Sequence, residues 1–149
     1  MQPRISYLIK RLERGVRSEL DAALRPLGVS TPEYTTLSVL RMRSGLSSAQ
    51  LARRAFVSGQ AMNQIVISLE QRGLIERAAD PDHGKILRAQ LTRKGTAVLK
   101  QCDTATMHVD RILTAQLSGA QEAALREALV KCGEALDDAE LGTPRTVLK

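Results

Sequence analysis

The spacing of hydrophobic residues changes once along this chain of 149 residues, and that change constrains the fold more than any other feature. From Ile5 to Leu27, and again after Thr92, apolar residues recur every three or four positions, which is typical of amphipathic helices. Between these helical parts, residues 74–91 contain two short extended runs. The segment Ala79–Gly84 separates the runs and has the composition of a turn. We therefore expect a mainly α-helical fold with one small β-hairpin.

Capping and helix-breaking residues place the expected helix boundaries. The first helix should stop around Pro26 and Gly28, and a short third helix should be interrupted at Val57-Ser58-Gly59. Ser47 and Ser118 each precede a glutamine at capping-box spacing. The expected N-caps are Thr31, Ser47, Ser58, Thr92 and Ser118, and the later helices should end near Met42, Arg72 and Gly142.

The order of these elements is that of a winged helix-turn-helix: helix, short helix, tight connection, helix and hairpin. We expect residues 1–149 to form a single domain with a DNA-binding lobe at residues 30–95. Helical segments 1–29 and 96–142 flank this lobe, and residues 143–149 should be a frayed tail.

Positive charge is concentrated in the middle third of the chain. Between Arg41 and Lys94 there are ten basic and four acidic residues, a surplus of six that equals the whole net charge of +6. The remainder has twelve residues of each sign. This pattern is typical of a nucleic-acid contact, although a merely basic, solvated surface is the alternative.

Composition excludes several other classes of protein. Three aromatic residues are too few for a platform that stacks single-stranded bases, and two cysteines cannot form a disulfide framework or a four-ligand zinc site. No apolar run approaches the roughly 20 residues that span a bilayer, and the first ten residues lack a signal-peptide pattern. Catalytic triads and glycine-rich phosphate loops are absent. We expect a cytoplasmic protein that is not an enzyme and uses no cofactor, metal or membrane.

The fourth helix has the pattern of a recognition helix. Its inner stripe should comprise Met62, Ile65, Val66 and Leu69. The opposite face carries residues suited to base edges, because asparagine and glutamine can bond adenine and a small apolar group can meet a thymine methyl. The candidate base contacts are Gln60, Ala61, Asn63 and Gln64. Ordinary solvated polar residues are the alternative interpretation.

Several motifs together resemble the MarR (multiple antibiotic resistance regulator) family. They are Leu51-Ala52-Arg53-Arg54, Leu69-Glu70-Gln71-Arg72-Gly73-Leu74-Ile75-Glu76-Arg77, Asp80-Pro81 and Leu91-Thr92-Arg93-Lys94-Gly95, which stand at the family's spacing. The resemblance covers essentially the whole chain. It implies that segments 1–29 and 96–142 are dimerisation helices, so that the first, fifth and last helices interlock in a homodimer. It also implies two half-sites in a pseudo-palindromic duplex DNA operator. The apolar stripes of residues 5–27 and 118–141 independently favour a dimer, since a winged helix of some 60 residues is too small to cover them.

Phosphate and wing contacts are expected from a mixed set of residues. These are Ser58, Arg53, Arg54, Arg72, His83, Lys85, Arg88 and Lys94. One departure from the family concerns the wing, which usually has Asp-x-Arg where this chain has His83-Gly84-Lys85. Lysine keeps the charge without arginine's planar fork, so we expect phosphate or shallow minor-groove contact. His83 fits a plain turn residue better than a phosphate ligand.

The resemblance also implies a repressor released by a small, often phenolic, ligand. Candidate ligand-lining residues are Tyr7, Arg11, Tyr34, Met107, His108 and Arg111, for each of which core packing is the alternative. Thiol-sensing members of the family have a reactive cysteine in the first helix, and this chain has none there. Cys102 and Cys132 lie at apolar positions of late helices, where cysteines are usually inert, so thiol sensing is disfavoured.

Two further functions remain open from the sequence. A nonspecific architectural DNA-binding protein would depend on Arg53, Arg54, Lys85, Arg88 and Lys94, while the polar face of the fourth helix would be dispensable. A winged helix used for protein contact would not need the concentrated positive charge. The sequence favours a specific transcription regulator over both.

Overall fold

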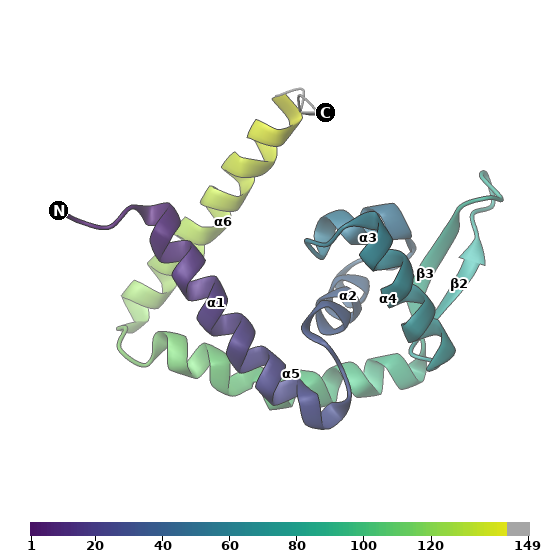
Figure 1. Ribbon diagram of the computed structural model, residues 1–149, viewed down its shortest axis with the longest axis horizontal. Coiled ribbons are helices and arrows are strands. Elements are labelled where there is room, and N and C mark those ends of the chain that lie inside the picture. Colours follow the sequence, from purple (N-terminus) through teal and green to yellow (C-terminus); the bar gives the residue numbers. More distant parts are fainter. Residues whose placement is uncertain (143–149) are drawn as a thin grey trace. The chain divides into compact units, whose positions relative to one another are not determined.

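The computed structural model describes residues 1–142 of the chain. The elements are α1 (Ile5–Leu24), the 3₁₀ helix η1 (Arg25–Leu27), α2 (Thr31–Met42), β1 (Leu46–Ser47), α3 (Ser48–Arg54), α4 (Gly59–Gln71), β2 (Ile75–Ala79), β3 (Leu87–Leu91), α5 (Arg93–Thr114) and α6 (Gly119–Gly142) (Figure 1). They form two compact units, Met1–Val109 and a second that begins at Asp110. The expected mainly helical fold with a small hairpin is confirmed. The frayed tail that we expected at residues 143–149 lies outside the described part of the chain.

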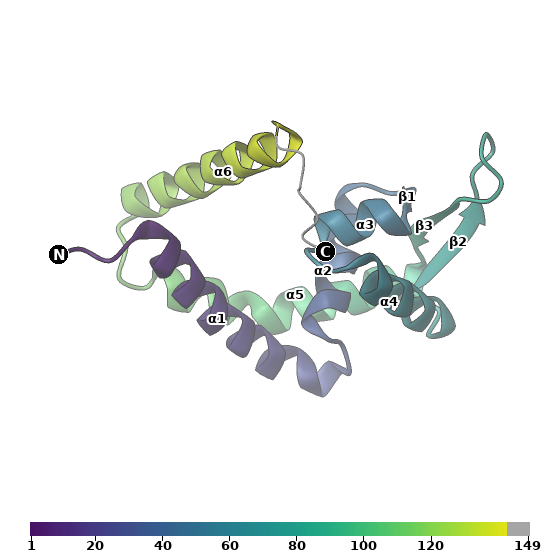
Figure 2. The same ribbon diagram turned by 45° about the horizontal axis from the view of Figure 1, so that its top comes forward.

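The sheet of the first unit has three antiparallel strands in the order β1-β3-β2 (Figure 2). Ile75 pairs with Leu91 and Ala79 with Leu87, so β2 and β3 form the expected hairpin. The sequence did not reveal β1, in which Leu46 pairs with Ala89. Two residues are too short to show an alternating pattern. This strand nevertheless attaches the start of α3 to the hairpin.

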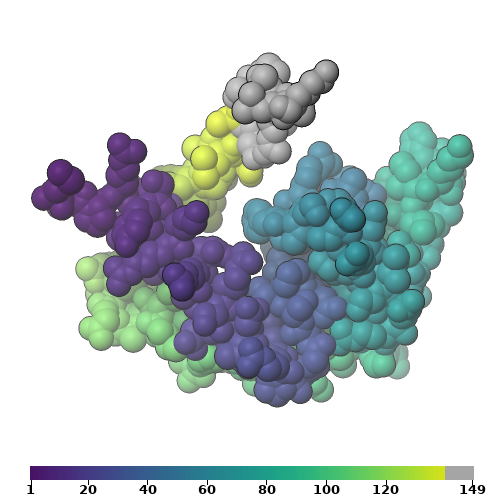
Figure 3. All heavy atoms as spheres, viewed as in Figure 1, coloured from purple at the N-terminus to yellow at the C-terminus, as the bar shows by residue number. Residues whose placement is uncertain are grey.

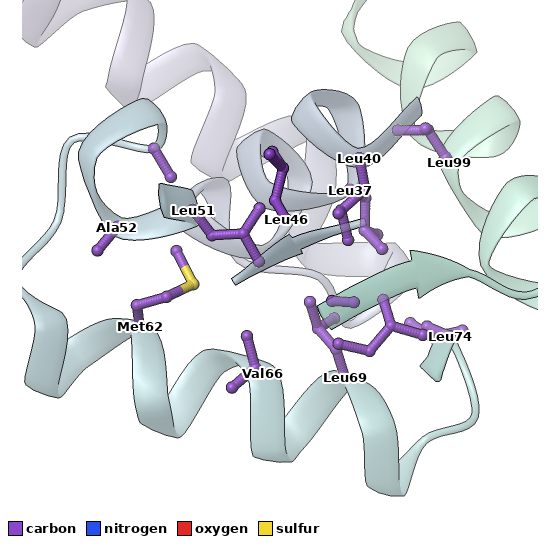
Figure 4. Close-up of a cluster of buried hydrophobic side chains, with 13 residues drawn as sticks. Leu37, Leu40, Leu46, Leu51, Ala52, Met62, Val66, Leu69, Leu74 and Leu99 are labelled. Carbon is purple, nitrogen blue, oxygen red and sulfur yellow. The ribbon is translucent and has the colours of Figure 1, made fainter. Parts of the chain in front are cut away.

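A hydrophobic core joins α4 to the other elements of the lobe (Figure 4). Met62, Val66 and Leu69 are at most 1% exposed and extend from one face of α4, as the inner stripe predicted. They pack in one cluster with side chains from α2, α3, the sheet and α5, including Leu37, Leu40, Leu51, Leu74 and Leu99. The polar face of α4 is thereby turned away from the core.

The N-cap of α2 differs from the expected one by a single position. Ser30, rather than Thr31, accepts the Glu33 N–H at 3.2 Å, and the Glu33 carboxylate accepts the Ser30 N–H at 3.0 Å. The Thr31 hydroxyl instead donates to Asp21 at 2.5 Å. Both residue types can cap a helix, so local sequence did not separate them. The caps at Ser47, Ser58, Thr92 and Ser118 are formed as expected.

The first turn of α5 lies directly against the segment that links α4 to β2. Thr92 donates its hydroxyl proton to Gly73 O at 2.6 Å, and its N–H bonds Leu74 O at 3.1 Å. A Cβ atom on Gly95 would lie 1.9 Å from Leu74 O. Only glycine fits at this position, because the helix backbone approaches another backbone too closely for any side chain.

The two cysteines have different surroundings. Cys102 of α5 is buried, and burial raises the pKa of its thiol, in agreement with an inert core position. Cys132 of α6 is exposed in the single chain, so the burial expected from its apolar position is wrong for the single chain. No side chain of α6 described by the structure, up to Ala139, is buried.

Candidate nucleic-acid interface

The N-terminal half of α4 presents most of the predicted base-contacting residues to solvent. Gln60, Asn63 and Gln64 are exposed, while Ala61 is half-buried. Ser58 caps the helix by accepting the Ala61 N–H at 3.1 Å. This end of α4 carries the positive pole of the helix dipole, which favours a negatively charged ligand.

Asn63 is held in place by the preceding helix. Ser48, the first residue of α3, donates a hydrogen bond to Asn63 Oδ1 at 2.9 Å. An amide oxygen has a second lone pair, and the amide nitrogen keeps both of its protons. The contact therefore fixes the direction of the side chain and leaves groups that can still bond a base edge.

The turn between α3 and α4 contains an unusual backbone position. Phe56 has φ of 59° and is 90% exposed. Val57 N–H bonds Ala52 O at 3.1 Å, which is the bond that closes a Schellman motif at a helix C-terminus. The left-handed position in this motif is normally glycine, and a non-glycine residue costs roughly 1–2 kcal/mol there. Because no glycine occupies position 56, the left-handed turn could not be recognised from the sequence.

The predicted cations fall into two groups. The side chains of Arg53, Arg54 and Lys85 are exposed and make no hydrogen bond or ion pair with any residue the structure describes. The same is true of Arg43 and Arg93, which were not singled out from the sequence. These five side chains are available to bind phosphates.

Arg72 and Lys94 contact the protein itself. Arg72 donates to Glu33 at 3.1 Å and to Gly28 O at 2.9 Å, which ties the end of α4 to the start of α2. Lys94 Nζ donates to Arg72 O at 3.0 Å. Both residues are thus used to position α4. Their expected contact with a DNA backbone stays a prediction.

Arg88 anchors the wing. Its guanidinium pairs with Asp80 and donates to Gly45 O at 3.0 Å and to Gln50 Oε1 at 3.4 Å. Asp80 is buried and also accepts the N–H groups of Asp82 at 2.8 Å and His83 at 3.2 Å. These backbone bonds, together with Arg88, lower the pKa of Asp80.

The wing tip beyond this anchor is open to solvent. His83, Gly84 and Lys85 are all exposed, and the hairpin projects past the neighbouring helices in the space-filling view (Figure 3). Arg88 therefore serves the base of the wing, while Lys85 is placed at the end that can reach a ligand.

The six candidate ligand residues have different surroundings, and their expected role stays a prediction. Tyr7 and Met107 are 59% and 57% exposed, and Arg11 is exposed too. His108 lies 3.5 Å from Glu19 of α1. Arg111 belongs to the second unit.

Tyr34, the remaining candidate, makes internal contacts. Its hydroxyl donates to Asp103 at 2.9 Å and lies 3.3 Å from Thr106, and burial raises its pKa. Asp103 also pairs with Arg41, so this cluster joins α2 to α5. Burial alone would raise the pKa of Asp103, but the bonds from Arg41 and Tyr34 outweigh it and the pKa is lowered.

One open hollow of about 340 Å³ lies beside the connection between α1 and α2. It is lined by Asp21, Arg25, Gly28, Val29 and Ser30, none of which is among the six candidates. Within residues 1–142, no three metal-ligating side chains come together, and no described helix is long and apolar enough to cross a bilayer.

Comparison with known proteins gives consistent matches. The profile of the MarR family matches residues 27–86. The HTH-type transcriptional repressors Rv2887 of Mycobacterium tuberculosis and Mb2911 of Mycobacterium bovis are each 38% identical to this chain over 129 residues, which cover 87% of this chain and 93% of the relative.

Solved structures agree with these matches. The crystal structure of Rv2887 in complex with DNA has a TM-score of 0.72 at 36% identity, covering 89% of this chain and 99% of that one. The crystal structure of Rv2887 in complex with salicylic acid has a TM-score of 0.74 at 37% identity, covering 88% of this chain and 97% of that one. The apo form of Escherichia coli MarR, 22% identical, shares the fold with a TM-score of 0.79 over 89% of this chain and 98% of that one. Together with the winged helix-turn-helix and its exposed α4 face, these relationships show that the chain belongs to the MarR family of transcription regulators.

Proposed function

We propose that this chain is a sequence-specific, duplex-DNA-binding repressor that acts as a homodimer and is released by a small aromatic acid or phenol. The observation that carries the proposal is the juxtaposition, within one helix-turn-helix, of an exposed amide face on α4 and the unpartnered cations Arg53 and Arg54. Phosphate contacts from such cations give affinity, and amide contacts to base edges give specificity. The crystal structure of the relative Rv2887 with DNA supports the same use of the fold.

The proposed dimer is supported by apolar side chains outside the DNA-binding lobe. On α1, Ile5 and Leu12 are 73% and 52% exposed, and on α6, Leu129 and Leu136 are 50% and 69% exposed. Helices with such uncovered stripes normally bury them against another subunit. Light scattering at micromolar concentration should give twice the monomer mass of 16.3 kDa, and a monomer would contradict the proposal.

The proposed effector class rests on the relative Rv2887, which has been solved with salicylic acid and with p-aminosalicylic acid. Salicylate is the direct probe: it should weaken operator binding by this protein at millimolar concentration or below. Acetate at the same concentration serves as the control for a nonspecific effect of a carboxylate, because it lacks the aromatic ring.

The central test measures binding to the chain's own upstream DNA and to a scrambled duplex over a range of salt concentrations. The upstream DNA should be preferred at physiological salt, and the triple variant Gln60→Ala/Asn63→Ala/Gln64→Ala should lose that preference. Arg54→Ala should instead weaken binding to both duplexes. It should also reduce the slope of log affinity against log salt concentration by about one. Equal, salt-sensitive binding to both duplexes by the unmodified protein would favour an architectural DNA-binding protein.

A further inference from the structure

Phe56 is not explained by the packing of the lobe. A large apolar side chain that is 90% exposed gains little from folding, and its backbone occupies a left-handed conformation with φ of 59°. The end of α4 uses the same motif with a different residue. There Gly73 has φ of 70°, and the bond from Leu74 N–H to Leu69 O measures 2.9 Å. The chain thus places glycine in one such turn and phenylalanine in the other, where glycine would fit without strain.

The position of Phe56 indicates what could contact its ring. Arg53 and Arg54 precede it in the chain, and neither side chain has a hydrogen-bond or ion-pair partner in the described residues. Ser58, two residues later, caps the helix that carries the exposed amides. Phe56 therefore lies in the chain between residues suited to binding phosphates and residues suited to contacting base edges.

We propose that the Phe56 ring packs against the deoxyribose face of duplex DNA, next to the phosphates that Arg53 and Arg54 bind. This inference rests on the proposed function and names a contact within that interface. Positive charge on both arginines favours a polyanion as the occupant, and the sugars between successive phosphates provide an apolar surface. The contact would be independent of base sequence and would add affinity that salt does not screen.

The test separates loss of the ring from relief of backbone strain. Phe56→Gly and Phe56→Asn both suit a left-handed residue and both lack the ring, whereas Phe56→Tyr keeps it. Dissociation constants for the upstream duplex would be measured at several salt concentrations, with thermal unfolding measured at one fixed protein concentration. Arg54→Ala is the matched control for an electrostatic contact in the same turn.

We expect Phe56→Gly to unfold at a higher temperature than the unmodified protein and yet to bind DNA about ten-fold more weakly, a change of about 1.4 kcal/mol. The salt dependence should keep its slope, since no charge is lost, while Arg54→Ala should reduce that slope by about one. Phe56→Asn should also weaken binding, and Phe56→Tyr should bind within about two-fold of the unmodified protein.

Three results would overturn the inference. Unchanged DNA affinity in Phe56→Gly would mean that the ring does not contact DNA. A changed salt slope in Phe56→Gly would mean that the ring acts by positioning the arginines. An unmodified protein that binds no duplex at any salt would overturn the proposed function itself, and the inference with it.

Discussion

Arg72 Nη1 lies 3.1 Å from Glu33 Oε2, which joins the last turn of the proposed recognition helix to the first turn of α2. The same carboxylate group caps α2 through Ser30 N–H and accepts the Ser68 hydroxyl at 3.2 Å. The Glu33 side chain is only 13% exposed, so these contacts are partly shielded from water. Glu33 therefore links α4 to α2 and also caps the start of α2.

Arg72→Ala should lower the free energy of unfolding by about 1–3 kcal/mol, because it removes a charged hydrogen bond and leaves a largely buried carboxylate without that partner. Chemical denaturation at a fixed protein concentration measures the effect. Arg54→Ala removes an exposed arginine with no such partner, and it should change stability by less than about 0.5 kcal/mol.

A double-mutant cycle gives the coupling within the pair. Glu33→Gln keeps a side chain that can complete the capping box, so its effect reports mainly on Arg72 and Ser68. The coupling between Glu33→Gln and Arg72→Ala should reach at least about 1 kcal/mol. Additive effects of the two substitutions would show that the contact does not stabilise the fold.

Local sequence was sufficient for the helices and for four of the five expected N-caps, but it was insufficient for the N-cap of α2 and for contacts between distant residues. The capping residues act within three or four positions, so Ser47, Ser58 and Ser118 were identified from spacing alone. Glu33 and Arg72 are 39 positions apart, and neither residue's neighbours reveal the pair. Arginines used internally were consequently grouped with those that are free to bind phosphates.

The exposed face of α4 could be predicted from local sequence, whereas two features beside it could not. The polar face of α4 followed from helical periodicity, because the buried stripe leaves only the opposite face for a ligand. Phe56 was missed because a left-handed turn is normally recognised by its glycine. The hydrogen bond from Ser48 to Asn63 was also missed, because it depends on how α3 packs against α4.

Protonation of Asp80 should loosen the wing at low pH. Its pKa is lowered in the folded protein from an ordinary value of 3.8, first by the Asp82 N–H bond and then by Arg88. A carboxylate of this kind stabilises the fold above its unfolded pKa, and the contribution is lost as pH falls through the lower, folded pKa. The stability difference between the unmodified protein and Asp80→Asn should therefore be constant near neutral pH and shrink below about pH 4.

Denaturant unfolding at a series of pH values measures this difference directly. Asp82→Asn is the matched control, because Asp82 contributes a backbone N–H to the wing turn while its side chain is exposed. That variant should follow the unmodified protein across the pH range. A stability difference between the unmodified protein and Asp80→Asn that stays constant down to pH 2 would contradict the role assigned to the carboxylate.

Gly95→Ala should destabilise the lobe by about 3 kcal/mol or more, since its new methyl group would lie 1.9 Å from Leu74 O and a backbone atom cannot move aside. Gly15→Ala is the control, because a Cβ at this position of α1 meets no other atom within 4 Å. Replacing a helical glycine there should instead stabilise by about 0.5–1 kcal/mol. Thermal unfolding that ranks the two variants in the opposite order would mean that α5 does not approach the α4–β2 link this closely.

Ser48→Ala should reduce the sequence preference of DNA binding more than it reduces affinity for nonspecific DNA. The Ser48 hydroxyl holds the Asn63 amide at 2.9 Å, and without it the amide must be ordered by DNA itself. We expect the ratio of upstream to scrambled affinity to fall by about five- to ten-fold, at the lower end of the 1–3 kcal/mol that one good base contact supplies. Binding to the scrambled duplex, which depends on phosphate contacts, should stay within about two-fold.

Asn63→Ala sets the scale for this last measurement, because it removes the amide that Ser48 is expected to orient. Ser48→Ala should produce part of the loss seen in Asn63→Ala, and the double variant should be no worse than Asn63→Ala alone. Independent, additive losses would instead assign Ser48 a DNA contact of its own. A full preference for the upstream duplex in Ser48→Ala would show that the packing of α4 already orients Asn63 without the hydroxyl.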